Sequence, residues 1–459
     1  MEYTTTEKHS VLAAACITIF VNSIAGSMLN LALVSIGNDF HVGAHDLAWV
    51  TSIYFIVSVS FLLPAARLAD IYGKKKVFLA GTLITLFSML MCSLSWNIVS
   101  LYVFRGTSGI GLAFLASTSV SMISDVYPRG ERGTALGLNA MSMYIGATLG
   151  PSVGGFMTEF FGWRSIFMLI IPFMAAALIC MMRFGHNVVG TPDEPFDIKG
   201  SLFYGVAVTT FMFGFISLPE TYAYVLIVLG TLLLFGFVRM ENRVKAPIMM
   251  LGLFKNKGLT KSFVTIVTDY LGSYSVVFLL GLYLQNIGAL SPMHAGIVMM
   301  VQPVVQVIVT PIAGKLSDRL PLHILPTAGM IANVAGMCIL MFLGLEMNMA
   351  VLVLGLAVLG AGYGMFCAPN TTAAMAFTEP GSYNKSSALI STMRQIGFMS
   401  SMGVATCVIT MFIGSSMALN PSNYGIYVDA MHIIWAIGIA VGLIGIWFAW
   451  TTKNCRTAD

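Results

Sequence analysis

The sequence predicts an all-α integral membrane protein with fourteen membrane-spanning helices. Of its 459 residues, 57% are hydrophobic and only 9% are charged, whereas a soluble domain carries about 25% charged residues. The charges gather in clusters, separated by apolar runs of roughly 20 residues, which is the length that crosses the hydrocarbon core as a helix. Strands of a membrane barrel would alternate apolar and polar residues instead. Because lipid satisfies no free backbone group, the runs are predicted to be helices.

Each span is an apolar run between two polar breaks. The first begins after a short polar start with Glu2, Glu7 and Lys8, which lacks a small-residue cleavage site and predicts no removable signal peptide. In chain order, the predicted spans are 11–36, 47–66, 77–96, 98–123, 134–157, 165–183, 200–218, 222–239, 259–285, 293–313, 325–345, 349–370, 386–413 and 428–451.

The placement of lysine and arginine orients these spans. With the N-terminus on the cytoplasmic side, twenty of the 23 basic residues fall in cytoplasmic segments, Arg164 falls outside, and Arg105 and Arg394 fall within spans. An even number of spans puts both termini in the cytoplasm. The expected location is the cell membrane, crossed many times.

The two longest predicted cytoplasmic links, 183–199 and 239–258, bracket spans seven and eight. They indicate two six-helix bundles with two extra helices inserted between them. The predicted domains are an N-terminal bundle (1–184), the insertion with its flanking links (185–255) and a C-terminal bundle (256–459).

A loop motif occurs twice, once in each predicted bundle. Residues 66–75 read ARLADIYGKK after span two, and residues 314–321 read GKLSDRLP after span ten. Both resemble the G-x-L-a-D-r-x-G-r-k loop of the major facilitator superfamily, although the first copy departs from it at Ala66 and Ile71. The resemblance implies a conformational latch, in which a carboxylate meets helix N-termini and cations and the contacts break between two states; an ordinary positive-inside loop is the alternative. The latch residues are Asp70, Gly73, Lys74, Asp125, Arg129, Arg132, Gly314, Asp318 and Arg319.

Span five contains GATLGPSVGG at residues 146–155. It resembles the g-x-x-x-G-P-x-x-G-G motif of the drug:proton antiporters in that superfamily. Small residues four apart let two helices approach closely, and a proline removes one helix hydrogen bond. The motif implies a hinge or seal, with plain helix packing as the alternative; its residues are Gly146, Gly150, Pro151, Gly154 and Gly155.

Two ionisable residues lie deep in predicted spans. Arg105 opens RGTSGIG (105–111), which resembles the family's R-x-x-q-G-x-g motif with Ser108 in place of glutamine. A buried arginine is costly unless it faces water or a partner, so Arg105 is either functional or a structural hydrogen-bonding centre. Asp269 is the carboxylate placed well inside a span. Apolar surroundings favour its neutral form, so we expect Asp269, with Arg105, to couple protons, or else to pair with an arginine.

Further polar and aromatic residues within spans are candidates for a substrate cavity. They are Asn22, Asn30, Tyr54, Arg105, Tyr144, Tyr270, Tyr274, Gln302, Gln306 and Arg394. The 32 methionines and many aromatic residues suit a pocket for several apolar shapes.

The resemblance covers the whole chain and implies a fourteen-helix antiporter that exports hydrophobic drugs or related small molecules in exchange for protons. Residues 25–29 (AGSML) lack the acid usual near this family's first-helix asparagine, which together with the two span arginines favours an exporter of an anionic or lipid-like metabolite as the alternative. No zinc-protease, P-loop or serine-nucleophile motif occurs, so no enzyme activity, cofactor or metal is expected. The expected partners are a small-molecule substrate, protons and the lipid bilayer, with no nucleic acid and a monomeric chain.

Overall fold

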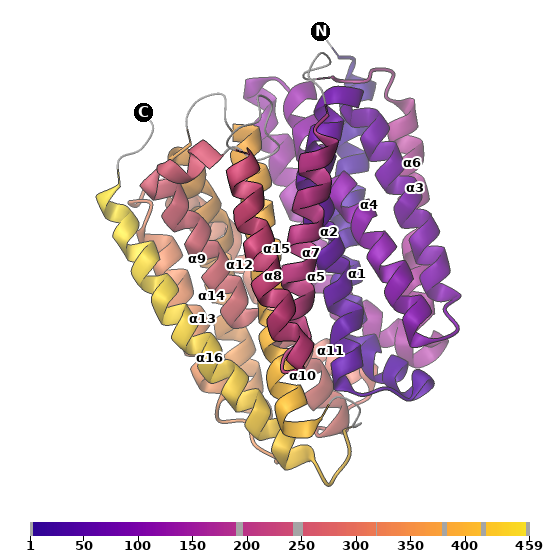
Figure 1. Cartoon of the computed structure of the whole chain (residues 1–459), viewed down its shortest axis with the longest axis vertical. Coiled ribbons are helices and arrows are strands. Elements are labelled where there is room, and N and C mark those ends of the chain that lie inside the picture. Colours follow the sequence, from indigo (N-terminus) through magenta and orange to yellow (C-terminus); the bar gives the residue numbers. More distant parts are fainter. Residues whose placement is uncertain are drawn as a thin grey trace. The chain divides into compact units, whose positions relative to one another are not determined.

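The computed structural model describes residues 3–189, 196–241, 251–317, 319–378, 383–414 and 419–455. Within these ranges the side chains of residues 129, 130, 132–134, 251, 383–385, 387 and 388 are not described. Every regular element in the described ranges is helical (Figure 1). The helices are α1 (Thr5–Phe40), α2 (Ala44–Tyr72), α3 (Lys74–Ser93), α4 (Ile98–Val126), α5 (Arg129–Phe161), α6 (Ser165–Arg183), α7 (Ile198–Ile216), α8 (Thr221–Glu241), η1 (Leu251–Lys255), α9 (Lys257–Ser273), α10 (Ser275–Asn286), α11 (Pro292–Met299), α12 (Val301–Ser317), α13 (Ile324–Leu340), α14 (Met349–Ala376), α15 (Tyr383–Ile413), α16 (Tyr424–Thr451) and η2 (Thr452–Asn454).

The helices match the predicted spans one for one. In the described part of the chain, twelve helical segments are long and apolar enough to cross a membrane. The remaining two predicted spans are α5, which is long but more polar, and α13, which is apolar but has 17 residues. The predicted all-α membrane fold is confirmed.

Two predicted spans are interrupted, each for a local reason. Between α9 and α10, the backbone N–H of Ser275 donates to Ser401 on α15 (2.9 Å) instead of continuing the helix. Between α11 and α12, Pro303 has no N–H to donate to the preceding turn. Each pair nevertheless forms one segment long enough to span the bilayer, Lys257–Asn286 and Pro292–Ser317.

The chain forms two compact units. Unit 1 contains most of α1, α2 from Trp49 onward, α3 to α6, α7 up to Phe213 and α8 from Val225. Unit 2 contains α9 to α16 together with two short segments from earlier in the chain, Ile36–Ala48 and Gly214–Tyr224. The predicted three-part division at residues 184 and 255 stays a prediction.

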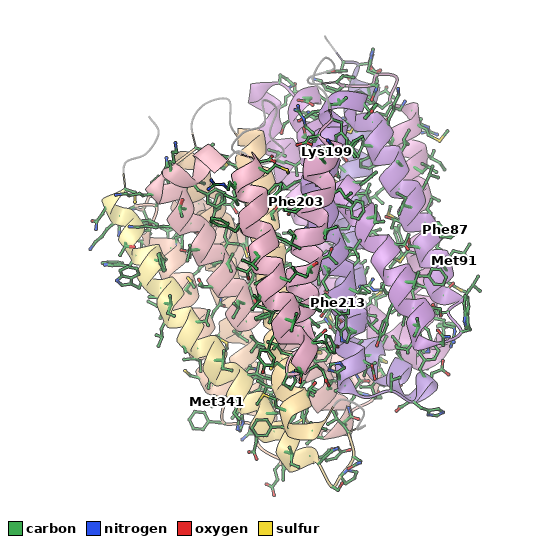
Figure 2. The ribbon with its side chains drawn as sticks, in the orientation of Figure 1. Phe87, Met91, Lys199, Phe203, Phe213 and Met341 are labelled. Atoms are coloured by element: carbon green, nitrogen blue, oxygen red, sulfur yellow. The ribbon has the colours of Figure 1, made fainter. Side chains whose placement is uncertain are left out.

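Large apolar side chains cover the outward faces of the helices. On α3, Phe87 and Met91 lie one turn apart on the outer side (Figure 2), and Phe87 is exposed. Phe235 on α8 and Trp447 on α16 are exposed as well. In water such faces would drive association; on membrane-spanning helices they contact lipid.

Candidate functional site

The first loop motif forms a tight turn between α2 and α3. Gly73 has φ +101°, a left-handed conformation that suits glycine. Lys74, whose side chain is nearly buried, forms an ion pair with Asp125 near the end of α4. Two predicted latch residues from distant parts of unit 1 are thus brought together.

The segment after α6 closes over this turn. Asn187 donates from Nδ2 to the carbonyl oxygen of Tyr72 (3.0 Å), and the Val188 carbonyl accepts from the N–H of Lys74 (2.9 Å). Lys75 donates to the Phe184 carbonyl. The packing of this segment on the turn could not be predicted, because a polar link after a span carries no signal of where it packs.

The remaining predicted latch residues of unit 1 lie at the end of α2 and at the start of α5. Asp70 lies in the last turns of α2. Arg129 and Arg132 lie in the first turn of α5, and their side chains are not among those that the structure describes. Glu131, between them, forms an ion pair with Lys8 (2.9 Å). Beside this pair, burial, and then the charge of Glu131, raise the pKa of Tyr127.

The second loop copy folds differently from the first. Gly314 lies inside α12 with open space around it, and Arg319 is exposed. Asp318 lies outside the described residues. The latch function of either copy stays a prediction.

The glycine motif of α5 packs directly against α1. A Cβ on Gly146 would lie 2.6 Å from the Phe20 carbonyl oxygen, and one on Gly154 would lie 2.5 Å from the Met28 Cα. Gly150 meets Ser27 in the same way. Pro151 and Gly155 are buried in the same helix. Any side chain at the three glycines would push the helices apart, so the close approach that the motif predicts is present.

Unit 1 brings three predicted cavity residues into one polar cluster. Arg105 is 3% exposed and donates from Nε to the Val50 carbonyl (3.2 Å). Its guanidinium lies 4.5 Å from the centre of the Tyr54 ring. Tyr54 donates to Oδ1 of Asn22 on α1 (2.5 Å). The cation is therefore held by a backbone carbonyl and by an aromatic face.

Two further predicted cavity residues of unit 1 lie on α1 and α5. Asn30 is buried and donates to the Gly26 carbonyl of its own helix (3.3 Å). Tyr144 lies on α5 and accepts a hydrogen bond from Thr148 on its backbone oxygen (2.9 Å). Their predicted role in a cavity stays a prediction.

Unit 2 contains the buried carboxylate. Asp269 on α9 is 3% exposed, and its Oδ1 accepts a hydrogen bond from Nδ2 of Asn333 on α13 (2.8 Å). An asparagine, and not an arginine, is thus the partner of this carboxylate among the described residues. Ser273 donates to the backbone oxygen of Asp269 (2.6 Å) and contacts the Tyr363 hydroxyl (2.7 Å). Asn333 is not among the predicted cavity residues, although it is the single amide in the apolar span 325–345.

Next to this carboxylate, aromatic rings and a cation gather on α15 and on the end of α9, including Tyr274 directly after α9. The Phe398 ring lies 4.2 Å from that of Tyr274 and 4.8 Å from that of Tyr270. The Arg394 guanidinium lies 5.8 Å from the Tyr270 ring centre. Tyr270 also contacts the Cys367 sulfur on α14 through its hydroxyl (3.1 Å). Because Tyr270/Tyr274 and Arg394/Phe398 are each four residues apart, one face of each helix supplies the group.

The two predicted glutamines lie on another helix of unit 2. Gln302 is buried on α12, where its backbone oxygen touches α14 at Gly360. Gln306 accepts from Thr310 on its backbone oxygen (2.7 Å).

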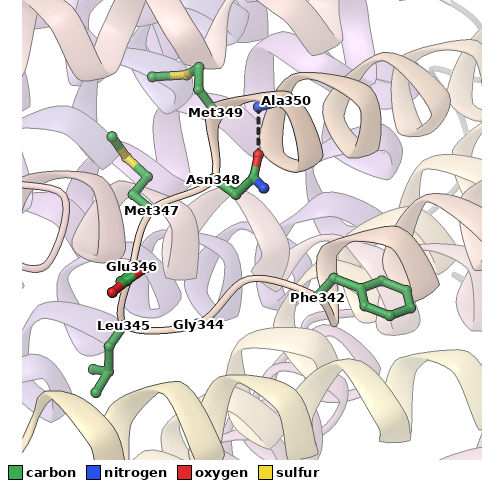
Figure 3. A pocket seen from close by; sticks show the side chains of 8 residues that line it. All are labelled: Phe342, Gly344, Leu345, Glu346, Met347, Asn348, Met349 and Ala350. Atoms are coloured by element: carbon green, nitrogen blue, oxygen red, sulfur yellow. Dashed lines mark hydrogen bonds between the residues drawn. The ribbon is translucent and has the colours of Figure 1, made fainter.

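A surface recess lies at the turn between α13 and α14, lined by Phe342 and residues 344–350 (Figure 3). Asn348 there accepts from the N–H groups of Ala350 (3.1 Å) and Val351 (3.3 Å). These bonds cap the N-terminus of α14, a structural role. The described residues include no cluster of three or more metal-ligating side chains.

The chain is similar in sequence to known transporters. The model of the Major Facilitator Superfamily matches residues 15–402. The chain is 30% identical over 447 residues to the riboflavin transporter RibZ of Clostridioides difficile, covering 96% of each protein. It is 28% identical over 412 residues to the multidrug resistance protein Stp of Mycobacterium tuberculosis, covering 88% of this chain and 76% of that protein.

Solved transporter structures share its fold. A bacterial homolog of the human lysosomal transporter Spinster, inward-facing and unoccupied, has a TM-score of 0.69 at 18% identity, with 98% of each chain covered. A peptide transporter POT mutant in complex with sulfate has a TM-score of 0.73 at 15% identity, covering 96% of this chain and 95% of that one. With the helical architecture and the matching family model, the chain is a multi-pass membrane transporter that belongs to the Major Facilitator Superfamily, as its motifs predict.

Proposed function

We propose that this protein exports hydrophobic, ring-containing small molecules across the cell membrane in exchange for protons. It acts as a monomer by alternating access, with both termini in the cytoplasm. The observation that carries the proposal is Asp269, a carboxylate buried in a membrane helix with one neutral hydrogen-bond donor on its side chain. The relative named a multidrug resistance protein supports efflux.

The proton carrier in this proposal is the Asp269 carboxyl. An ionised carboxylate is costly in an apolar interior, whereas the protonated acid is tolerated. When the transporter opens to one side of the membrane, water reaches Asp269 and the carboxyl takes up a proton. When it opens to the other side, the carboxyl releases that proton. Arg105 lies in the other unit and contributes to coupling as a fixed cation.

The substrate contacts in this proposal are aromatic side chains of unit 2. Tyr270, Tyr274 and Phe398 offer ring faces and edges to planar apolar molecules. The thioether side chains of the many methionines adapt to different shapes.

The other predicted groups act in the conformational change. The Lys74–Asp125 ion pair closes a latch at the α2–α3 turn, and the glycine face of α5 acts as a hinge against α1. An ion pair and a close helix contact are each either formed or broken, so both motifs suit a transporter that switches between two packed conformations.

The test uses the full chain in everted membrane vesicles. Addition of a lipophilic dye substrate is expected to release protons from energised vesicles of the wild-type protein. Asp269→Asn keeps the side-chain volume and is expected to remove this proton release while the protein still inserts normally. Undiminished dye-dependent proton movement in Asp269→Asn rules out Asp269 as the carrier.

A second candidate substrate is an organic anion or a polar ring compound such as a flavin. Two cations beside tyrosine rings, Arg105 and Arg394, favour it, and so does the relative named a riboflavin transporter. Competition in the same vesicles separates the two candidates. Inhibition of dye transport by riboflavin or an aromatic carboxylate, lost in Arg394→Gln, supports the second; insensitivity to both supports the first.

A further inference from the structure

The two side chains of the Asp269–Asn333 pair leave two oxygen atoms without donors. The single hydrogen bond between them joins Nδ2 of Asn333 to Oδ1 of Asp269 (2.8 Å). Oδ2 of Asp269 and Oδ1 of Asn333 are both buried and have no hydrogen-bond partner among the described residues. The residues are 3% and 1% exposed, so bulk water does not reach either atom freely.

The two oxygens without donors belong to two groups that already share a hydrogen bond, and both oxygens are acceptors. A carboxylate and an amide oxygen are both acceptors, so they cannot bond to each other while Asp269 is ionised. A protonated carboxyl turns Oδ2 into an O–H donor, and the amide oxygen is an acceptor on the same partner group. A carboxylic acid and a primary amide are complementary in this way, because each supplies one donor and one acceptor.

We propose that Asn333 is a positioning residue that distinguishes the two protonation states of Asp269. It holds the ionised carboxylate by one charge-assisted hydrogen bond and the protonated acid by two neutral ones, so proton uptake adds a second, neutral hydrogen bond between α9 and α13. This inference rests on the proposed function and identifies the partner of its proton carrier.

The packing around Asn333 holds its amide in place. Its side-chain oxygen is seated against α14 at Gly362, where a Cβ would overlap with it. Asn333 therefore contacts helices α9 and α14 with its two ends. A change in the hydrogen bonding of the amide therefore affects the packing of three helices of unit 2, namely α9, α13 and α14.

The other polar and ionisable groups around Asp269 form contacts with residues other than the Asp269 carboxylate. From α14, Tyr363 bonds to the Ser273 hydroxyl and Cys367 bonds to the Tyr270 hydroxyl. From α15, the Arg394 guanidinium lies 5.8 Å from the centre of the Tyr270 ring. From α16, Gly438 contacts α9 at Gly272. Among the described residues, the side-chain donor on the carboxylate itself is the Asn333 amide.

The experiment replaces this amide with an apolar side chain of the same branching, Asn333→Leu, in protein reconstituted into liposomes. A buried carboxylate without a donor is disfavoured more than a buried acid without an acceptor. We expect the pH of half-maximal proton-driven transport to rise, by about a tenfold change in proton concentration. The matched control is Asn370→Leu, a buried asparagine of the same unit that bonds to the Ser262 carbonyl (3.4 Å); its pH profile should stay as in the wild type.

Infrared difference spectroscopy measures the hydrogen bonding of protonated Asp269 directly, independently of transport. The C=O stretch of protonated Asp269 is identified as the band that Asp269→Asn removes. It should move to higher wavenumber in Asn333→Leu, because the acid loses its hydrogen bonds, and stay in place in Asn370→Leu. An unmoved band in Asn333→Leu overturns the inference.

A second variant covers the case in which Asn333→Leu does not fold. In Asn333→Asp, two adjacent carboxyls share one proton, so the band should titrate in two steps; one unchanged step overturns the inference. The two proposals also fail separately. Proton-driven transport that survives in Asp269→Asn rejects the proposed function, whereas its loss there with an unmoved band in Asn333→Leu rejects only the role of Asn333.

Discussion

The two copies of the loop motif occupy matched places in the sequence and fold differently. The first, between α2 and α3, is a left-handed turn at Gly73 with an ion pair and a covering segment. In the second, between α12 and α13, Gly314 continues the helix and the neighbouring Lys315 is exposed. A shared motif therefore fixes where a loop lies but not how it packs, since the packing depends on residues far away, such as Asn187 and Asp125.

The first expected difference between the copies lies in their lysines. Lys74→Met removes the charged hydrogen bond to Asp125, whose side chain is 28% exposed, and should cost about 2 kcal/mol of stability. Lys315→Met, on an exposed site, should change stability by less than about 0.5 kcal/mol. Thermal unfolding in detergent measures both. The double variant Lys74→Met/Asp125→Leu should recover part of the loss, and equal effects of the two lysine variants would mean that the copies are equivalent.

The motif glycines should differ next. Gly73→Ala forces a side chain into φ +101° and against Asn187, at a cost of about 2 kcal/mol. Gly314→Ala meets open space inside a helix and should be neutral or stabilising by up to about 1 kcal/mol. The comparison uses the same substitution and the same unfolding assay. Destabilisation by Gly314→Ala as large as that by Gly73→Ala contradicts the difference in turn geometry.

The covering segment gives a smaller effect. Asn187→Ala removes one hydrogen bond to the Tyr72 carbonyl, worth about 1 kcal/mol. Because a side chain at position 73 would overlap Asn187 itself, Gly73→Ala/Asn187→Ala should cost less than the sum of the single variants. Strict additivity in the double-mutant cycle would show that Asn187 does not restrict the side chain at position 73.

The spans and their order could be predicted from the sequence, because apolar length and basic loops are local signals. A close approach of α5 to another helix could also be predicted, since glycines four residues apart make it possible, but its partner α1 is known only from the structure. The partner of Asp269 could not, because nothing local in α13 connects Asn333 with a residue 64 positions earlier. For the same reason, the sequence did not reveal that residues 36–48 and 214–224 pack with the C-terminal helices.

The smallest expected effect is a pH dependence at the second loop. His323 ends this loop beside the Trp450 ring (5.1 Å), and burial, followed by the charge of Lys453, lowers its pKa. The folded chain therefore binds this proton less readily than the unfolded chain, so stability should fall as the pH drops below about 6.5. Because the ring is half-buried and water screens the charge, the loss should be about 0.3 kcal/mol. Unfolding midpoints measured at neutral and mildly acidic pH should differ less in His323→Gln than in the wild type. Since the first loop carries a lysine and glycine but no histidine, a matching acid sensitivity that persists in His323→Gln would place its origin elsewhere in the protein.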